Sequence, residues 1–494
     1  MLLLLAVACV ASLPLVVHPW YDATNDGSSY IVTARSIAAG EGYRYLGAPF
    51  RVRPPGFAAL LAPVLLLRGL DFLALNLTVA AFGVAAVCLL FLHQRERVGV
   101  PLALLTAAAV WLNPGYERLS SQVMADVPGL ALLVACLLLE RWASLRPSLA
   151  REVVLGLAIG LACHVRAQLV LLVPAIAVAR WLARSGAEPR SASIARRLLP
   201  FTATTGLVLL PWIVSVQRSA PVPPADQTLN YTIGTAMWHE DPGNPRSRRL
   251  GVTEILARVP RNVDALGLVL GSRMALRVPG SPWPGPAARW AYRGVALMML
   301  GCLLHVLLRR RAPAELFAAG TLVVVAVYFV FTDRLALPLY VLALAATVET
   351  LARVLGSRLG SDRAATALTA AALLILTLAD LGPRREWEGI ERRHRSFVET
   401  ALAVGASLAP DARLAAGQGL HHSVYLERPV YNLALAVRRA GRADAAEEVI
   451  DRYALNTVVL SALVPQDAQL VEYFSRRYGP GVPAGTARVW RVRP

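Results

Sequence analysis

The chain has 494 residues, of which 56% are hydrophobic, and a formal net charge of +18 at pH 7. Several apolar runs approach the ~20 residues that a helix needs to cross a bilayer, so the pattern excludes a soluble globular protein and indicates a polytopic α-helical membrane protein. The basic residues are all arginines, mostly beside apolar segments. Membrane topology and anionic headgroups account for them there, so nucleic-acid binding is not expected.

The apolar segments predict about eleven transmembrane helices. The first is interpreted as a retained helix, with a cleaved signal as the alternative. The run 54–67 holds 14 residues, which as a helix reach about 21 Å against ~30 Å of hydrocarbon, so it is expected in the interface or only part way in. The predicted spans are 1–18, 71–93, 101–117, 127–141, 152–165, 168–183, 198–216, 287–308, 314–331, 335–353 and 364–380.

The positions of the arginines predict which loops face outward. Arginine-rich ends follow the fourth, sixth, eighth and tenth spans and are expected in the cytoplasm. The first loop (19–56), the large loop (217–286) and everything after residue 380 then face outward, so a cytoplasmic (inner) membrane protein with an extracytoplasmic C-terminus is predicted.

The composition changes after residue 380 to that of a soluble domain. Short strands are predicted at 412–416, 429–433, 455–461 and 486–492, between helical stretches at 445–453 and 467–478. The chain is therefore divided into a transmembrane domain, residues 1–380, and a C-terminal α/β domain, residues 381–494.

The first outer loop contains the leading candidate acid. Asp26 precedes a helix-compatible run that includes Tyr30 and ends at Gly40, which would act as a C-terminal cap. Asp26 can be read as the N-cap of this helix, worth roughly 1 kcal/mol. The functional alternative is a carboxylate held at the membrane surface, and Asp22 is a second candidate for that role.

Further polar residues gather at the same predicted face. Asp126 lies at the start of the fourth span; an N-cap is one interpretation, but an acid at the hydrocarbon edge costs on the order of a few kcal/mol unless paired or wet. Arginines such as Arg166 and Arg334 suit a lipid phosphate, with headgroup snorkelling as the alternative. The remaining candidates are His164, beside Arg166, and His239 and Glu240 in the large loop, where a structural histidine is the alternative.

The order of these features resembles the GT-C glycosyltransferases, polytopic enzymes that take a sugar from a polyprenyl-phosphate carrier, such as the protein O-mannosyltransferases and the aminoarabinose transferase of lipid A. The resemblance covers about residues 1–380. Asn25 replaces the first acid of the family's commoner acidic pair, which leaves open whether Asp22 shares the role of Asp26. The matching motifs are Asp26 with Tyr30 and Gly40-Glu41-Gly42, Arg53-Pro54-Pro55-Gly56, Asp126-Val127-Pro128, Arg166 to Pro174, Pro211-Trp212 and Arg334 to Pro338.

The resemblance implies inverting transfer of a glycosyl group to an envelope glycan, lipid or protein at the outer face of the membrane. Asp26 would be the general base, and Arg53, Arg334 and Arg166 would bind the donor phosphate. Asp126 would either share a divalent cation with Asp26 or orient the acceptor. The competing class is a non-catalytic flippase or accessory protein that binds polyprenyl-phosphate sugars, although polar residues at one face and no visible repeat favour the enzyme.

Overall fold

The structure is a computed structural model of the chain. It describes residues 1–183, 190–217, 227, 233–244, 246–274, 285–379, 387–461 and 467–492. The chain forms two compact units. The helical unit comprises residues 1–18, 76–217 and 251–385, and the mixed unit comprises residues 19–75, 218–250 and 386–494. The first outer loop thus belongs to the same compact unit as the C-terminal residues.

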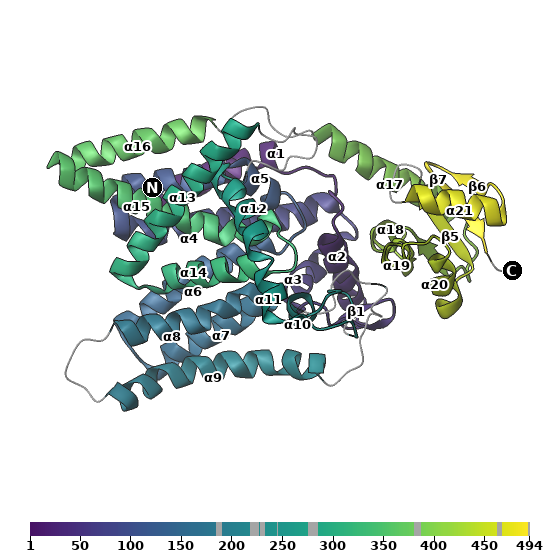
Figure 1. Cartoon of the computed structure of the whole chain (residues 1–494), viewed down its shortest axis with the longest axis horizontal. Coiled ribbons are helices and arrows are strands. Elements are labelled where there is room, and N and C mark those ends of the chain that lie inside the picture. Colours follow the sequence, from purple (N-terminus) through teal and green to yellow (C-terminus); the bar gives the residue numbers. More distant parts are fainter. Residues whose placement is uncertain are drawn as a thin grey trace. The chain divides into compact units, whose positions relative to one another are not determined.

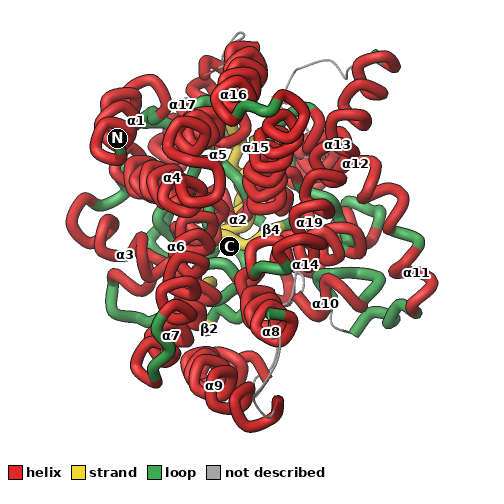
Figure 2. The backbone as a smooth tube through the Cα atoms, turned by 90° about the vertical axis from the view of Figure 1, so that its left-hand side faces the viewer, coloured by secondary structure: helices red, strands yellow, loops and turns green. Residues whose placement is uncertain are grey.

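The helical unit is built from long apolar helices joined by short turns (Figures 1 and 2). Its elements are α1 (Leu2–Val16), most of α4 (Phe72–Trp111), α5 (Pro114–Ser120), α6 (Asp126–Leu145), α7 (Leu149–Val165), η1 (Ala167–Leu171), α8 (Leu172–Leu182), α9 (Arg190–Gln217), α11 (Val252–Leu256), α12 (Val259–Gly271), α13 (Pro286–Arg310), α14 (Pro313–Val327), η4 (Asp333–Ala336), α15 (Leu337–Leu359) and α16 (Asp362–Ala379).

The predicted spans fall on helices, except that the third, 101–117, extends past the end of α4 into α5, and the polytopic helical class is confirmed. The second and third spans are joined in α4, which is interrupted at Gly99, where φ is +79° and Pro101 follows. In the described ranges, five helices are long and apolar enough to cross a membrane by length and composition, and several others are shorter. The run expected to be too short is α3 (Gly56–Arg68), a helix of 13 residues.

Close helix packing in this unit depends on small residues. The helices α7 and α9 lie side by side (Figures 1 and 2). A Cβ atom on Gly156 would lie 2.5 Å from the carbonyl oxygen of Phe201, and one on Gly160 would lie 2.7 Å from Cβ of Val208. Glycine at these positions therefore lets the two backbones approach, as is common between membrane helices.

The mixed unit combines the first outer loop with the C-terminal residues. Its helices are α2 (Asn25–Ala38), α3, α10 (Ile233–Trp238), α17 (Trp387–Ser407), α18 (Gly419–Tyr425), α19 (Ala434–Ala440), α20 (Ala445–Tyr453) and α21 (Ala468–Tyr478). A two-stranded hairpin pairs β1 (Arg44–Tyr45) with β2 (Ala48–Pro49). The larger sheet contains β3 (Leu414–Ala416), β4 (Val430–Asn432), β5 (Thr457–Ser461), β6 (Val482–Ala484) and β7 (Ala487–Arg491).

The larger sheet confirms the predicted α/β character of the C-terminal residues. Its strand order is β4-β3-β5-β7-β6, with β3 parallel to β4 and β5, and β7 antiparallel to its neighbours. All four predicted strands are present, whereas β6 was not expected. Strand β6 contains Pro483 and forms an edge of the sheet, where a residue without an N–H is tolerated.

Candidate active site

Helix α2 begins two residues earlier than an Asp26 cap would require. The side chain of Thr24 accepts a hydrogen bond from the N–H of Gly27 at 3.0 Å, so Thr24 is the N-cap. The interpretation of Asp26 as the cap is therefore wrong, because Asp26 already lies in the first turn of the helix. The predicted end is confirmed, since Gly40 has a φ of +76° and donates to the carbonyl of Ile37.

Asp26 instead pairs with the arginine that follows the hairpin. The Nη2 atom of Arg53 forms an ion pair with Oδ1 of Asp26, and its Nη1 donates to the hydroxyl of Ser29 at 2.7 Å. The guanidinium lies 5.6 Å from the ring centre of Tyr30, whose ring packs edge-on against Phe57. The side chains of Asp26 and Arg53 are 19% and 20% exposed. Two predicted site residues, an acid and a phosphate-binding candidate, thus meet at one partly accessible place.

Asp22 lies in the same unit with a different partner. Its Oδ1 atom is 3.5 Å from Nη2 of Arg393 on α17, and its side chain is 13% exposed. The two acids of the first loop are therefore distinguished by their partners, since Asp26 is held within the loop and Asp22 contacts the C-terminal part of the unit.

Asp126 forms the centre of a second cluster, in the helical unit. The N-cap interpretation is wrong here too, because Ala125 is the cap residue and no side chain caps α6. The carboxylate, with its side chain 1% exposed, pairs with Arg166 at 2.7 Å and with Arg334 at 3.8 Å. Two arginines thus lie beside one buried carboxylate, as expected because a buried charge needs a partner.

The helix that carries Asp126 also shapes the path of its partner. A Cβ atom on Gly129 would lie 2.9 Å from Cβ and 3.0 Å from Cγ of Arg166, so the arginine side chain crosses α6 where a glycine leaves room. On the other side, Arg334 lies 3.8 Å from the sulfur of Met124. The cluster thus joins α6, the turn after α7 and the turn before α15.

The other predicted site residues have local partners. The Nε2 atom of His164 lies 3.1 Å from the carbonyl of Val208, so this histidine contacts α9. His239 is buried, and its Nδ1 atom lies 3.0 Å from the carbonyl of Ser247, which favours the structural interpretation. Glu240 is exposed and pairs with Arg248.

A divalent cation bound by Asp26 and Asp126 stays a prediction. Among the described residues, no three His, Cys, Asp or Glu side chains lie close enough together to hold a metal ion. Asp26 and Asp126 belong to different compact units, and each faces arginine. A guanidinium group therefore lies beside each of these two carboxylates.

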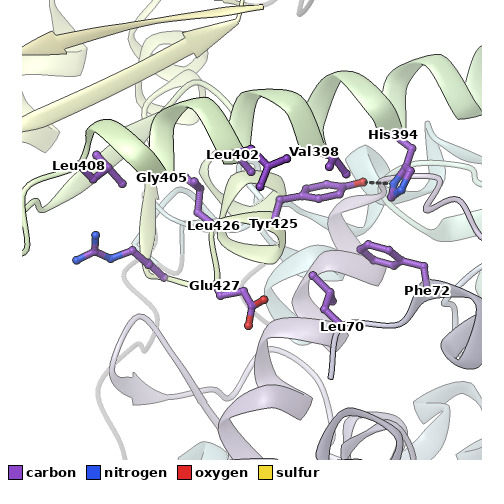
Figure 3. A pocket seen from close by; sticks show the side chains of 12 residues that line it. Leu70, Phe72, His394, Val398, Leu402, Gly405, Leu408, Tyr425, Leu426 and Glu427 are labelled. Atoms are coloured by element: carbon purple, nitrogen blue, oxygen red, sulfur yellow. Dashed lines mark hydrogen bonds between the residues drawn. The ribbon is translucent and has the colours of Figure 1, made fainter. Parts of the chain in front are cut away.

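A pocket of about 570 Å³ lies elsewhere in the mixed unit (Figure 3). Its lining residues come from α17 and the residue after it, from residues 425–428, and from Leu70 and Phe72 at the start of α4. The hydroxyl of Tyr425 lies 3.0 Å from Nδ1 of His394 (Figure 3), and Glu427 and Arg428 are charged residues of the lining. None of the predicted site residues is among its described lining residues.

Some contacts of the site were not predicted. Ser29, three residues after Asp26 on the same face of a helix, could have been found from its spacing. The hydrogen bond between Ser28 and His421 joins residues 393 positions apart, and no local pattern in the sequence predicts it.

Comparisons with known proteins bear on the fold. Residues 52–214 match the family described as dolichyl-phosphate-mannose-protein mannosyltransferase, whereas a comparison with curated proteins found no match. The chain is similar to ArnT from Cupriavidus metallidurans bound to undecaprenyl phosphate, with a TM-score of 0.62, 14% identity, and coverage of 99% of this chain and 97% of that one.

Two structures of archaeal oligosaccharyltransferases are also similar to this chain. The Archaeoglobus fulgidus oligosaccharyltransferase in complex with zinc and sulfate gives a TM-score of 0.58 at 13% identity, over 93% of this chain and 67% of that one. AglB from the same organism, in complex with an inhibitory peptide and a dolichol-phosphate, gives 0.56 at 12% identity, over 92% and 69%. The expected resemblance is confirmed: this chain is a polytopic membrane protein with the fold of the GT-C glycosyltransferase superfamily.

Proposed function

We propose that this chain transfers a glycosyl group from a polyprenyl-phosphate-linked sugar to an acceptor at the outer face of the cytoplasmic membrane, with inversion at the anomeric carbon. The fold supports glycosyl transfer, and two similar proteins were solved with undecaprenyl phosphate and a dolichol-phosphate. The observation that carries the proposal is the Asp26–Arg53 pair, which puts a proton acceptor beside a cation that suits phosphate.

The reaction assigns a separate task to each group. The acceptor hydroxyl attacks the anomeric carbon from the side opposite the lipid phosphate, and its proton passes to the carboxylate of Asp26. The bond between the anomeric carbon and the phosphate oxygen breaks, and the polyprenyl phosphate leaves with the electron pair. Arginine guanidinium groups, with Arg53, Arg166 and Arg334 as the candidates, stabilise the charge that develops on this leaving group.

Asp126 has a supporting task in this scheme. Its buried carboxylate pairs with Arg166 and Arg334 and would hold both guanidinium groups in a fixed orientation before the donor binds. Such preorganisation costs nothing at the moment of reaction, which is why fixed charges are effective in catalysis. A divalent cation bound by Asp26 and Asp126 would supply further positive charge, and the transfer reaction proceeds with or without it.

Transfer can be tested with the purified chain in liposomes. A panel of radiolabelled polyprenyl-phosphate sugars is supplied together with a membrane extract that contains envelope glycans, lipids and proteins, with and without EDTA. We expect one label to move to an acceptor. Loss of transfer with EDTA, restored by Mg²⁺ or Mn²⁺, would support the metal version. A labelled donor that crosses the bilayer without transfer would instead indicate the flippase alternative.

The orientation can be tested with reporter fusions. A reporter fused after Asp380 should be active outside the cytoplasm, and one fused after Arg311 should be active inside, because arginine-rich ends stay in the cytoplasm. The opposite pattern at either point would contradict an outward-facing site.

A further inference from the structure

The helix that carries Asp26 packs against the C-terminal α/β residues as well as against its own loop. Helix α2 has 14 residues, and a helix of that length is marginal in water without tertiary contacts. One set of contacts joins it to α3 and another joins it to α18, in the same compact unit. The direction of the Asp26 side chain therefore depends on what holds α2.

A buried hydrogen-bonded chain links α2 to α18. The hydroxyl of Tyr21 lies 2.9 Å from the hydroxyl of Ser28, which lies 2.7 Å from Nδ1 of His421. Ser28 is 0% and His421 is 6% exposed. With the ring proton on Nε2, Ser28 donates to His421 and its oxygen can accept from Tyr21, whose hydroxyl also lies 3.3 Å from the carbonyl oxygen of Thr24.

The charge state of His421 suits this arrangement. Burial, with a smaller contribution from neighbouring His422, lowers the pKa of His421 to about 4. The ring is therefore neutral at pH 7, and its Nδ1 atom can accept the proton of Ser28.

A second contact fixes the other end of α2. The guanidinium of Arg35 donates to the carbonyl of Ser423 at 3.1 Å and to that of Val424 at 2.8 Å. These carbonyls belong to the last turn of α18, where a helix leaves acceptors without internal partners. One forked side chain thus satisfies two acceptors and ties α2 to α18.

Helix α18 is itself firmly placed. The N–H of Val430 on β4 donates to the hydroxyl of Ser423 at 2.9 Å. Tyr425, at the end of α18, lies parallel to the ring of Phe397 on α17, and its hydroxyl meets His394 (Figure 3). A Cβ atom on Gly419 would lie 2.4 Å from the carbonyl of Tyr431, so the start of α18 lies directly on the backbone of β4.

We propose that the C-terminal α/β residues act as a positioning element for the candidate catalytic helix, with His421 and Arg35 as positioning residues that hold α2, and thereby Asp26, through α18. This inference rests on the proposed function for its effect on rate, although the ordering of α2 can be measured without any activity.

The test compares substitutions in α18 of the full chain. His421→Leu removes the acceptor, His421→Asn retains an acceptor near the place of Nδ1, and His422→Leu is the matched control. His422 is also buried and is adjacent, but its described hydrogen bond goes to the carbonyl of Gln418, the N-cap residue of α18. Hydrogen exchange of the α2 amides and the kcat and KM of transfer are measured for each variant.

We expect His421→Leu to speed exchange in α2 at least about tenfold and to lower kcat roughly 10- to 100-fold with little change in KM for the donor, because a small displacement of a catalytic group is enough for such a loss. His421→Asn should restore most of the protection of α2 from exchange and most of the kcat, and His422→Leu should resemble the wild type in both measurements. Unchanged exchange in α2 of the His421→Leu protein would overturn the proposal.

A second substitution guards against general destabilisation. Ser28→Ala removes the same hydrogen bond from the α2 side with a smaller change in volume. If the bond acts as proposed, the effects of Ser28→Ala and His421→Leu on α2 exchange are non-additive, whereas additive effects would refute it. If the wild-type chain transfers no sugar, the proposed function fails, and the exchange measurements still decide whether α18 holds α2.

Discussion

Replacing Asp26 by asparagine separates chemistry from helix stability, because the cap of α2 belongs to Thr24. Asparagine keeps the shape of the side chain and can still accept a hydrogen bond from Arg53, but it cannot take a proton from the acceptor. The lost ion pair joins two side chains that are 19% and 20% exposed, so the cost in stability should be about 1 to 2 kcal/mol, between the values for exposed and for buried ion pairs. The rate should fall roughly 100-fold or more, as is usual when a general base is removed.

Thr24→Ala is the matched control. It removes the side chain that accepts the hydrogen bond of Gly27 and should cost about 1 kcal/mol of stability. The two variants should therefore unfold at similar temperatures while only Asp26→Asn loses transfer, which steady-state rates and thermal unfolding in detergent would show. A folded Asp26→Asn protein that transfers within about threefold of wild type would refute the assignment and direct attention to Asp22 or Asp126.

Three further substitutions test other parts of the structure. Arg334→Lys keeps the charge beside Asp126 but loses the fork, so donor KM should rise about tenfold at nearly constant kcat if Arg334 binds the phosphate; an unchanged KM would count against this role. Gly129→Ala puts a methyl group against the Arg166 side chain and should lower stability by about 1 to 3 kcal/mol, as measured by thermal unfolding. Gly301→Ala on α13 is the control, because the space around its Cβ position is open, and it should leave the stability unchanged. Burial raises the pKa of Asp467 to about 7. The folded state therefore holds the proton of this carboxyl more tightly than the unfolded state, and stability is lost as the pH rises from about 4 to 7. Asp467→Asn should reduce this loss when Tm is compared at pH 5 and pH 8, and an equal loss of Tm in the variant and the wild type would contradict the reasoning.

The sequence alone determined the class of the protein and the order of its helices. The length of an apolar run is matched to the thickness of the membrane, and the arginines beside it determine its orientation. Both signals can be read in each segment separately, without knowledge of the tertiary structure. Three local features were also predicted: the short length of α3, the end of α2 at Gly40 and the α/β pattern after residue 380. Each of them depends on residues that are close together in the sequence.

The tertiary structure decided which polar groups meet. Sequence spacing made Asp26 and Asp126 look like caps, yet Thr24 caps α2 and no side chain caps α6, so both acids instead pair with arginine. Asp126 joins Arg334 from a distant helix, and Ser28 meets His421 across 393 residues. Local periodicity reports which face of an element is buried, whereas the partner of a buried charge or hydroxyl is set by where separate segments pack, and only the folded chain brings those segments together.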